Sequence, residues 1–230
     1  MTFGAVFPRA MRPAFGPGLA ASAAAATWWT SGGATGAVAV YQPKGAASLA
    51  ASYTNLANPG TYDAAPGVAP TWDATNGWTF NGSTQWLNTG VTPVNNQTWS
   101  MIVRFSGVAA TGFQVLAGMR VTDAAVFGFQ WRNTNYSVYY QSGAGLEIIG
   151  AVSSGIVAVA GTTGYKDGIA QSGSIGAGTG AAFNATIGIG AANSAIGAQR
   201  FLASNIQALA IYNNNVAAYM SALVTAIAAL

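Results

Sequence analysis

Apolar and polar residues alternate in many short runs between residues 34 and 212, and turn residues such as Gly and Asn close most of these runs. The clearest run is residues 98–107, TWSMIVRFSG. One face of this run carries Trp99, Met101, Val103 and Phe105, and the other carries Ser100, Ile102 and Arg104. Alternation with a period of two is typical of a strand. A series of short strands separated by glycine-rich turns predicts an all-β fold, either a sandwich or a barrel.

The two ends of the chain follow different patterns. Residues 1–33 are rich in Pro, Gly and Ala, which predicts an extended N-terminal arm. From residue 213 the apolar residues are spaced by three and four, which predicts one amphipathic helix over 213–230, with Asn213 or Asn214 as its N-cap. The residues at this helical spacing are Val216, Tyr219, Met220, Leu223, Val224, Ile227 and Leu230. Residues 34–212 then form the β-domain between the arm and the helix.

The predicted arm carries apolar anchors and two cations. Phe3, Phe7 and Phe15 are spaced by Pro and Gly, and Arg9 and Arg12 lie among them. Large apolar side chains on an extended strap suit docking in a partner's pockets, so we predict that these residues bind a partner chain or particle. An equally weighted alternative is that the arm folds back on its own domain. The Ala-rich run that follows resembles a secretory signal, but Pro and Gly interrupt it, so we expect no cleavage.

Charge is unusually sparse. Charged residues make up 6% of the chain, with eight Lys and Arg against five Asp and Glu. Nucleic-acid binding needs clustered cations, and apart from Arg9 and Arg12 the cations here are scattered, so we expect no nucleic-acid partner. No apolar run reaches the roughly 18 residues of a membrane span. A surface with few ionic groups suits burial in contacts with other chains or with copies of the same chain.

The candidate catalytic groups are few. The chain has no Cys and no His, which excludes disulfides and removes the commonest metal ligand and general base. Glycosidases typically need two carboxyl groups about 5–10 Å apart, and no two acids here lie closer than ten residues in sequence. The acids are Asp63, Asp73, Asp123, Glu147 and Asp167. We therefore predict that the protein is not an enzyme and needs no cofactor, with Glu147 as a solvated strand residue.

The remaining acids are better explained by turns than by chemistry. Asp167 lies in GYKDGIAQSG, where Asp-Gly favours a tight hairpin turn, ahead of a role as metal ligand or catalytic acid. Asp63 and Asp73 share one loop and are the only candidate calcium pair, but Asx turns explain both more simply, so we predict no metal site. Asn81-Gly82 predicts a further hairpin, joining the two halves of residues 78–90.

The order of these motifs resembles that of laminin-G-like and concanavalin A-like jelly-roll domains. GWTFNGSTQWLNTG (77–90) resembles their opening strand pair, and NQTWSMIVRFSG (96–107) the core strand that follows. GYKDGIAQSG (164–173) corresponds to a late hairpin, and SNIQALAIYNNNV (204–216) resembles the closing strand that leads into a helix. The resemblance covers roughly residues 36–225 and implies a jelly-roll β-sandwich. The E-x-D-x-x-E motif of the fold's hydrolytic relatives is absent, so the resemblance implies no catalytic set.

Two functions are consistent with these observations. An arm ahead of a jelly roll resembles phage and prophage virion surface proteins, which implies a decoration protein on the virion surface, attached to a capsid, tail or partner chain. The alternative is an extracellular glycan-binding adhesion module, whose partner is a cell-surface glycan. Its candidate platform is Trp131 and Tyr136, flanked by Asn133 and Asn135. Ordinary strand pairing, with these aromatics in the core or across strands, is the preferred interpretation of the same residues.

Overall fold

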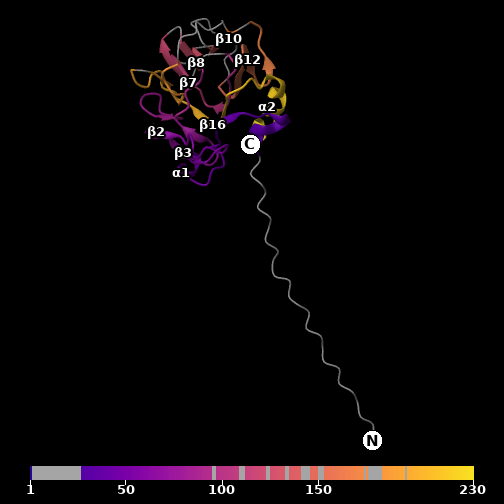
Figure 1. Cartoon of the computed structure of the whole chain (residues 1–230). Helices are drawn as coiled ribbons and strands as arrows, with labels where there is room; N and C mark the ends of the chain where they lie inside the picture. Colours follow the sequence, from indigo (N-terminus) through magenta and orange to yellow (C-terminus); the bar gives the residue numbers. More distant parts are fainter. Residues whose placement is uncertain are drawn as a thin grey trace.

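The computed structural model describes residues 1, 27–94, 97–108, 112–122, 125–132, 135–140, 146–149, 153–173, 175, 183–194 and 196–230. Side chains are described for all of these except residues 132, 135–140 and 146–149. The described residues form two stacked β-sheets with short helices outside them (Figure 1). The predicted all-β sandwich with a C-terminal helix is confirmed.

Sheet A contains eight strands in the described part of the chain, in the order β13-β12-β11-β6-β16-β4-β3, with β1 also paired to β16. The strands are β1 (Ala37–Tyr41), β3 (Thr71–Asp73), β4 (Gly77–Thr79), β6 (Ser100–Ser106), β11 (Gly155–Ala160), β12 (Thr163–Lys166), β13 (Ile169–Ala170) and β16 (Asn205–Tyr212). The central strands β6 and β16 are antiparallel and pair from Ser100 opposite Tyr212 to Ser106 opposite Asn205.

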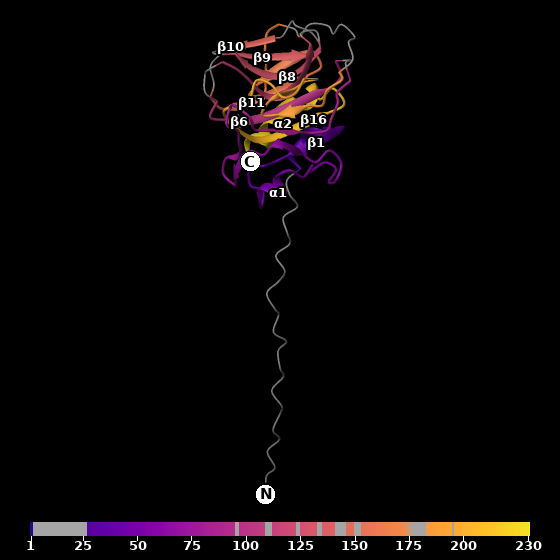
Figure 2. The same cartoon turned by 90° about the vertical axis from the view of Figure 1, so that its left-hand side faces the viewer.

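Sheet B has the order β10-β9-β8-β7-β14-β5-β2, with β15 also paired to β7. The strands are β2 (Ala65–Val68), β5 (Trp86–Asn88), β7 (Phe113–Thr122), β8 (Ala125–Arg132), β9 (Asn135–Tyr140), β10 (Leu146–Ile149), β14 (Gly188–Ile189) and β15 (Ala192–Asn193). Figure 2 shows β8, β9 and β10 of this sheet above β6, β11 and β16 of sheet A. The helical segments are η1 (Trp28–Gly33), α1 (Leu49–Ser52), η2 (Ala217–Tyr219) and α2 (Met220–Ala228).

The interior lies between the inner faces of the two sheets. The predicted alternation in residues 98–107 is confirmed, because Met101, Val103 and Phe105 are fully buried in this interior. Ile206, Leu209 and Ile211 of β16 join them, as do apolar side chains from β7 and β8. Full burial of one such side chain contributes roughly 1.5–3 kcal/mol to stability.

The outer face of sheet A is also buried, beneath α2 and η1. Leu223 and Ile227 of α2 are fully buried against it. Small side chains form much of the sheet surface under the helix, which allows close packing. These small residues are Ala158, Ala160, Ala208 and Ala210, in two strands that flank β6. Sheet A is therefore covered by sheet B on one side and by helices on the other.

Arg104 of β6 stabilises the C-terminal end of α2. Its Nη1 donates hydrogen bonds to the carbonyl oxygens of Ile227, at 2.8 Å, and of Leu230, at 3.1 Å. A cation at this end of a helix satisfies carbonyls that lack intrahelical partners. At the other end, the predicted cap is wrong. Neither Asn213 nor Asn214 begins the helical segment, whereas Asn215 Oδ1 accepts a hydrogen bond from the Ala217 N–H at 2.9 Å, just before η2.

Residues 28–33, at the end of the predicted arm, form η1 and pack on the domain. Trp28 and Trp29 are 2% and 8% exposed and share a cluster with α2. The Tyr212 hydroxyl donates to the Trp29 carbonyl oxygen at 2.9 Å. A Cβ added at Gly32 would lie 2.9 Å from the Cβ of Ala222, so a glycine allows this close approach to α2. Figure 1 shows η1, in indigo, beside the yellow α2.

The predicted turn at Asp167 is confirmed. Asp167 and Gly168 have φ of 49° and 83°, and Lys166 pairs with Ile169, which is the geometry of a tight primed hairpin turn. The sequence did not indicate the second role of this residue. Asp167 Oδ1 accepts a hydrogen bond from the Ile156 N–H at 2.8 Å, so the carboxylate also ties the hairpin to β11.

The predicted hairpin at Asn81-Gly82 is wrong. The strands before and after it, β4 and β5, belong to different sheets, so this segment crosses from one layer of the sandwich to the other. Asn81 Oδ1 accepts hydrogen bonds from the N–H groups of Ser83, Thr84 and Gln85 at 3.0–3.2 Å. The side chain therefore stabilises a crossover loop, a role that local turn signals do not distinguish from a hairpin.

Two truncations should separate the N-terminal segment from the domain. Deleting residues 1–26 should leave a cooperatively folding protein, because η1 and its contacts remain. Deleting residues 1–33 removes Trp28 and Trp29, and truncation of one buried aromatic alone costs about 3–5 kcal/mol. Urea unfolding of both variants measures this difference. Equal stability of the two truncated proteins would show that η1 is not part of the folded core.

Candidate functional site

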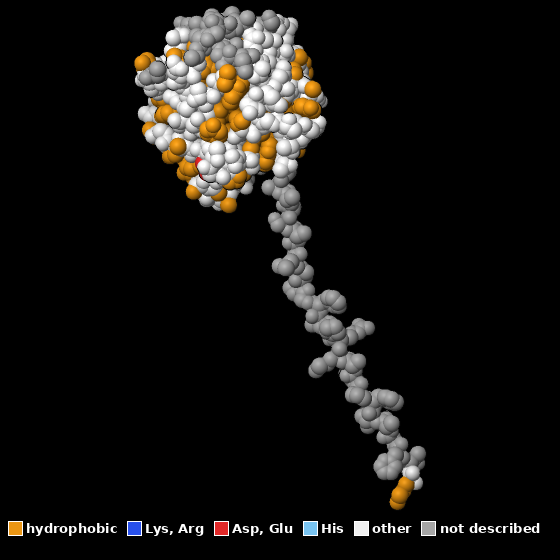
Figure 3. All heavy atoms as spheres, in the orientation of Figure 1, with side chains coloured by type: hydrophobic (Ala, Val, Ile, Leu, Met, Phe, Trp, Pro, Cys, Tyr) orange, Lys and Arg blue, Asp and Glu red, His pale blue; other side chains and the backbone are white. Residues whose placement is uncertain are grey.

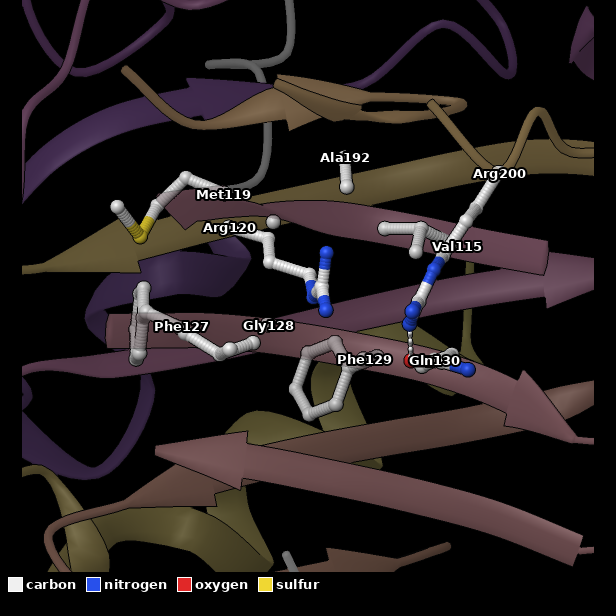
Figure 4. Close-up of a pocket in the computed structure, with 11 residues that line it drawn as sticks. Val115, Met119, Arg120, Phe127, Gly128, Phe129, Gln130, Ala192 and Arg200 are labelled. Atoms are coloured by element: carbon white, nitrogen blue, oxygen red, sulfur yellow. Dashed lines mark hydrogen bonds between the residues drawn. The ribbon is translucent and has the colours of Figure 1, made fainter. Parts of the chain in front are cut away.

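The outer face of sheet B carries a narrow depression at its centre. Its floor is formed where Gly118 of β7 pairs with Gly128 of β8. The neighbours of these glycines along each strand, such as Met119 and Phe127, point into the interior, so both glycines lie on the outer face. Figure 4 shows residues that line the depression, among them Arg120, Gln130 and Arg200. Both glycines are themselves buried, beneath the side chains that border the depression.

The glycines are required by close approach of the two strands. A Cβ added at Gly118 would lie 2.6 Å from the Phe127 carbonyl oxygen. A Cβ added at Gly128 would lie 2.4 Å from the Ala117 carbonyl oxygen, and Gly128 has a φ of 146°, which other residues rarely adopt. Strand packing therefore selects the same residues that form the floor.

Two arginines from different parts of the chain border the depression. Arg120 lies in β7, and Arg200 lies in the loop between β15 and β16. Figure 4 shows both guanidinium groups over β8, close to Gly128 and Gln130. Arg200 donates a hydrogen bond through Nη1 to Oε1 of Gln130, whose side chain is 4% exposed. The depression therefore combines guanidinium and amide groups above a flat backbone floor.

The backbone and side chain of Arg200 are both fixed by β7. Its carbonyl oxygen accepts a hydrogen bond from the Val115 N–H at 2.9 Å. Its guanidinium lies 5.5 Å from the ring centroid of Phe113, a cation–π geometry. Arg200 also has a φ of 57°, an uncommon value for a residue other than glycine. These restraints hold the guanidinium over the depression, which lowers the entropy cost of binding a ligand there.

Guanidinium groups are donors with a permanent positive charge, and they bind carboxylates with planar, directional hydrogen bonds. The Gln130 amide, which is buried beside Arg200, adds a neutral polar group to the same site. In its chemistry the depression is therefore suited to a small ligand with a carboxylate and hydroxyl groups.

The structure places the predicted glycan platform differently. Trp131 is 1% exposed and belongs to the interior cluster, and it pairs across strands with Tyr136. This arrangement agrees with the preferred interpretation of strand pairing, and the Trp131 ring offers no exposed stacking surface. Asn135 and Tyr136 lie in β9 with side chains outside the described residues, and Asn133 is outside them altogether. The predicted arm residues Phe3, Phe7, Arg9, Arg12 and Phe15 are also outside the described residues.

The described acids of the candidate calcium pair act within their own loops. Asp63 Oδ1 accepts hydrogen bonds from the N–H groups of Asn55, at 2.8 Å, and Gly60, at 3.1 Å. Asp73 accepts from the backbone of Asn76 and Thr75, and these hydrogen bonds lower the pKa of its carboxyl group. Within the described ranges, no three His, Cys, Asp or Glu side chains gather as a metal site would require. Asp123 lies outside those ranges, as does the side chain of Glu147 in β10.

Sequence reasoning missed the arginines and glycines of the depression. Gly118 and Gly128 each interrupt an apolar strand, in FQVLAGMRV and VFGFQWRN. A single glycine within a strand is a sign of close backbone approach or of a ligand site, and this signal was present in both strands. The position of Arg200 had no such signal, because it is 70 residues away from Gln130 in sequence.

No family model matches the chain, and no curated protein matches its sequence. Solved structures with the same fold include three of Trypanosoma rangeli sialidase. The complex with 2-keto-3-deoxy-D-glycero-D-galacto-2,3-difluoro-nononic acid has a TM-score of 0.60 and 17% identity, over 88% of this chain and 35% of that chain. A mutant with trans-sialidase activity has a TM-score of 0.58 and 16% identity, over 84% and 33%. The complex with sialic acid has a TM-score of 0.55 and 15% identity, over 82% and 32%.

These likenesses confirm the β-sandwich, and the chain spans about a third of the sialidase chains that it matches. None of these likenesses is to a laminin-G or phage protein, so they do not support the predicted family or virion role. In the described part of the chain, no helix has the length and apolar character to span a membrane.

The prediction that the protein is not an enzyme is contradicted by these matches, because the chains that share the fold are sialidases, which are enzymes. The prediction rested on the absence of His and of a close carboxylate pair. Sialidases are exceptions to the two-carboxylate rule, since they use a tyrosine nucleophile. The missing groups therefore do not exclude this class of chemistry.

An alanine at position 128 should test the close approach of β7 and β8. We expect Gly128→Ala to lower the free energy of unfolding by more than about 2 kcal/mol, since backbone strain alone costs roughly 1–3 kcal/mol and a backbone clash adds to it. Gly45→Ala is the matched control. Gly45 also has a positive φ, of 79°, but an added Cβ would meet nothing within 4 Å. Equal losses for the two variants in urea unfolding would contradict the close approach.

Proposed function

We propose that this domain binds glycans, and that the depression on sheet B receives a sugar that carries a carboxylate. The observation that carries this proposal is the pairing of two guanidinium groups, from Arg120 and Arg200, above the floor of Gly118 and Gly128. A carboxylate accepts hydrogen bonds from guanidinium groups, while the hydroxyl groups of a sugar bond to neighbouring amide groups.

The structural comparisons support this choice. One of the sialidase structures that share the fold holds sialic acid, a sugar acid with one carboxylate and several hydroxyl groups. The likeness at 15% identity concerns the fold, so the choice of ligand for this chain rests on the arginines themselves.

The low charge of the chain makes the two arginines distinctive. Figure 3 shows a face on which scattered hydrophobic side chains lie in a mostly uncharged surface. With eight cations in the whole chain, two in one depression are a concentrated feature of the surface. A cation in a shallow, partly enclosed site attracts an anionic ligand more strongly than one on an open surface.

Attachment and location remain part of the proposal. Residues 2–26, with the predicted anchors, precede η1, which packs on α2 at the outer face of sheet A. The depression lies on the outer face of sheet B, on the opposite side of the sandwich. A tether on one face and a sugar site on the other suits a domain displayed on a surface, either a virion or the outside of a cell.

Charge-removing substitutions test the proposed site. We expect wild-type protein to bind free sialic acid in isothermal titration calorimetry, and Arg120→Gln to weaken that binding at least tenfold. One charge-assisted hydrogen bond is worth about 1.5–3 kcal/mol, and a tenfold change corresponds to about 1.4 kcal/mol. Binding should also weaken as salt rises, because salt screens the charge.

Lys166→Gln is the matched control, because it removes one positive charge from β12 of sheet A, away from the depression. It should leave binding unchanged. Wild-type protein that binds neither sialic acid nor glucuronic acid would contradict the proposal. So would equal binding by wild type and the Arg120→Gln variant.

A further inference from the structure

A second group of side chains occupies the outer face of sheet B beyond the depression. It consists of Trp86 and Asn88 of β5, Thr186, which precedes β14, and Asn193 of β15; we refer to it as the Trp86 cluster. All four residues are partly exposed. Leu87, between Trp86 and Asn88, is fully buried in the interior, so its two neighbours face outwards. The cluster thus combines an aromatic ring, two amides and a hydroxyl group on one face.

The Trp86 ring is held in place by the edge strand β2. A Cβ added at Gly67 would lie 2.1 Å from Trp86 Nε1 and 2.2 Å from its Cε2. Only a glycine therefore allows the ring to rest against the backbone of β2 at this point. β2 also has a register irregularity here, between Pro66 and Val68. A ring fixed in this way loses little conformational entropy when a ligand stacks on it.

The amides of the cluster are partly satisfied by one another and partly available. Asn193 Nδ2 donates to Thr186 Oγ1 at 2.7 Å, and Thr186 Oγ1 donates to Asn88 Oδ1 at 2.6 Å. Asn88 Oδ1 also accepts from the Gly90 N–H at 2.9 Å. These bonds orient the two amides, and they leave Asn88 Nδ2 and Asn193 Oδ1 without a partner among the described residues. One donor and one acceptor are thus positioned for an external ligand.

The register of sheet B puts the cluster in line with the depression. Asn88 pairs with Gly188, and Gly188 pairs with Gly118 on the floor of the depression. Neighbouring strands are about 4.8 Å apart, so Asn88 lies roughly 10 Å from Gly118 across the sheet. The backbone of residues 191–193 passes over Gly188, since an added Cβ there would lie 2.6 Å from the Ala191 carbonyl oxygen. A low ridge therefore separates the two sites, at a distance comparable with the length of a disaccharide.

We infer that the Trp86 cluster is a second sugar subsite, which makes the ligand an oligosaccharide of at least two units. This inference rests on the proposed glycan binding at the depression. The acidic sugar lies at Arg120 and Arg200, and the oligosaccharide crosses the ridge near Asn193. A neutral sugar then stacks the apolar face of its ring on Trp86 and hydrogen bonds to Asn88 Nδ2. Stacking of this kind needs an aromatic face and no charge, which matches the composition of the cluster.

The comparison of free sialic acid with 3′-sialyllactose tests this inference. The trisaccharide adds two neutral sugars to the acidic one, and we expect wild-type protein to bind it roughly two- to tenfold more tightly, as one aromatic contact allows. The affinity for 3′-sialyllactose divided by that for free sialic acid gives a ratio that measures the second subsite. Trp86→Ala should reduce this ratio to about one and leave the affinity for free sialic acid unchanged. Trp86→Phe, which keeps an aromatic face, should retain most of the ratio.

Two further readouts hold even if Trp86→Ala perturbs folding. Asn88→Asp keeps Oδ1 as acceptor for Thr186 and Gly90 but removes the Nδ2 donor, so it should lower the same ratio. The indole N–H resonance of Trp86 in wild-type protein should shift with the trisaccharide and not with free sialic acid.

The outcomes separate the two proposals. If free sialic acid binds but the ratio is one in wild type, or stays unchanged in folded Trp86→Ala protein, the second subsite is overturned and the proposed function stands. If wild-type protein binds neither of these sugars and does not bind glucuronic acid, both are overturned.

Discussion

The architecture depends on the burial of sheet A on both of its faces. Along β16, Ile206, Leu209 and Ile211 pack into the interior between the sheets, while Ala208 and Ala210 lie beneath the helices. A sheet buried on both sides needs a covering layer, and η1 and α2 supply it. Arg104, at the end of that covered face, provides hydrogen bonds that the last turn of α2 lacks. Because most of the outer face of sheet A is occupied in this way, the glycan site that we propose lies on the outer face of sheet B.

Strand packing on sheet B then shapes the candidate site. The close approach of β7 and β8 demands glycine at positions 118 and 128, and the result is a floor without side chains. The same principle recurs at Gly67, where the absence of a side chain lets Trp86 lie on the edge strand. Arg200 reaches the floor because the Val115 N–H bonds to its carbonyl group and Phe113 supports its guanidinium. The polar groups of the site are thus held by contacts that also belong to the fold.

The features that could be predicted from the sequence depend on local physics. The alternation in β6 and the Asp167 turn follow from period-two patterning and from the tolerance of Asp-Gly for positive φ. Features that depend on which layer a strand joins could not be predicted in this way. Asn81-Gly82 has a hairpin signal, yet the next strand crosses to the other sheet.

The candidate site was largely beyond sequence reasoning, because tertiary contacts between distant residues create it. Arg200 and Gln130 meet only once the sandwich has formed. Trp131, an obvious aromatic candidate in sequence, points inward because its neighbours in β8 set the alternation of that strand. The predicted absence of enzymatic activity also failed, since it was inferred from missing groups and overlooked chemistry that does not need them.

A nuclear magnetic resonance titration tests the central claim, glycan binding by the outer face of sheet B, most directly. Uniformly ¹⁵N-labelled protein would be titrated with 3′-sialyllactose and the amide shifts mapped on the fold. We predict saturable shifts concentrated in β7, β8, β5 and residues 191–200, with little change in β11, β12 or α2. Shifts concentrated on sheet A and its helices, or no saturable shifts at millimolar sugar, would contradict it.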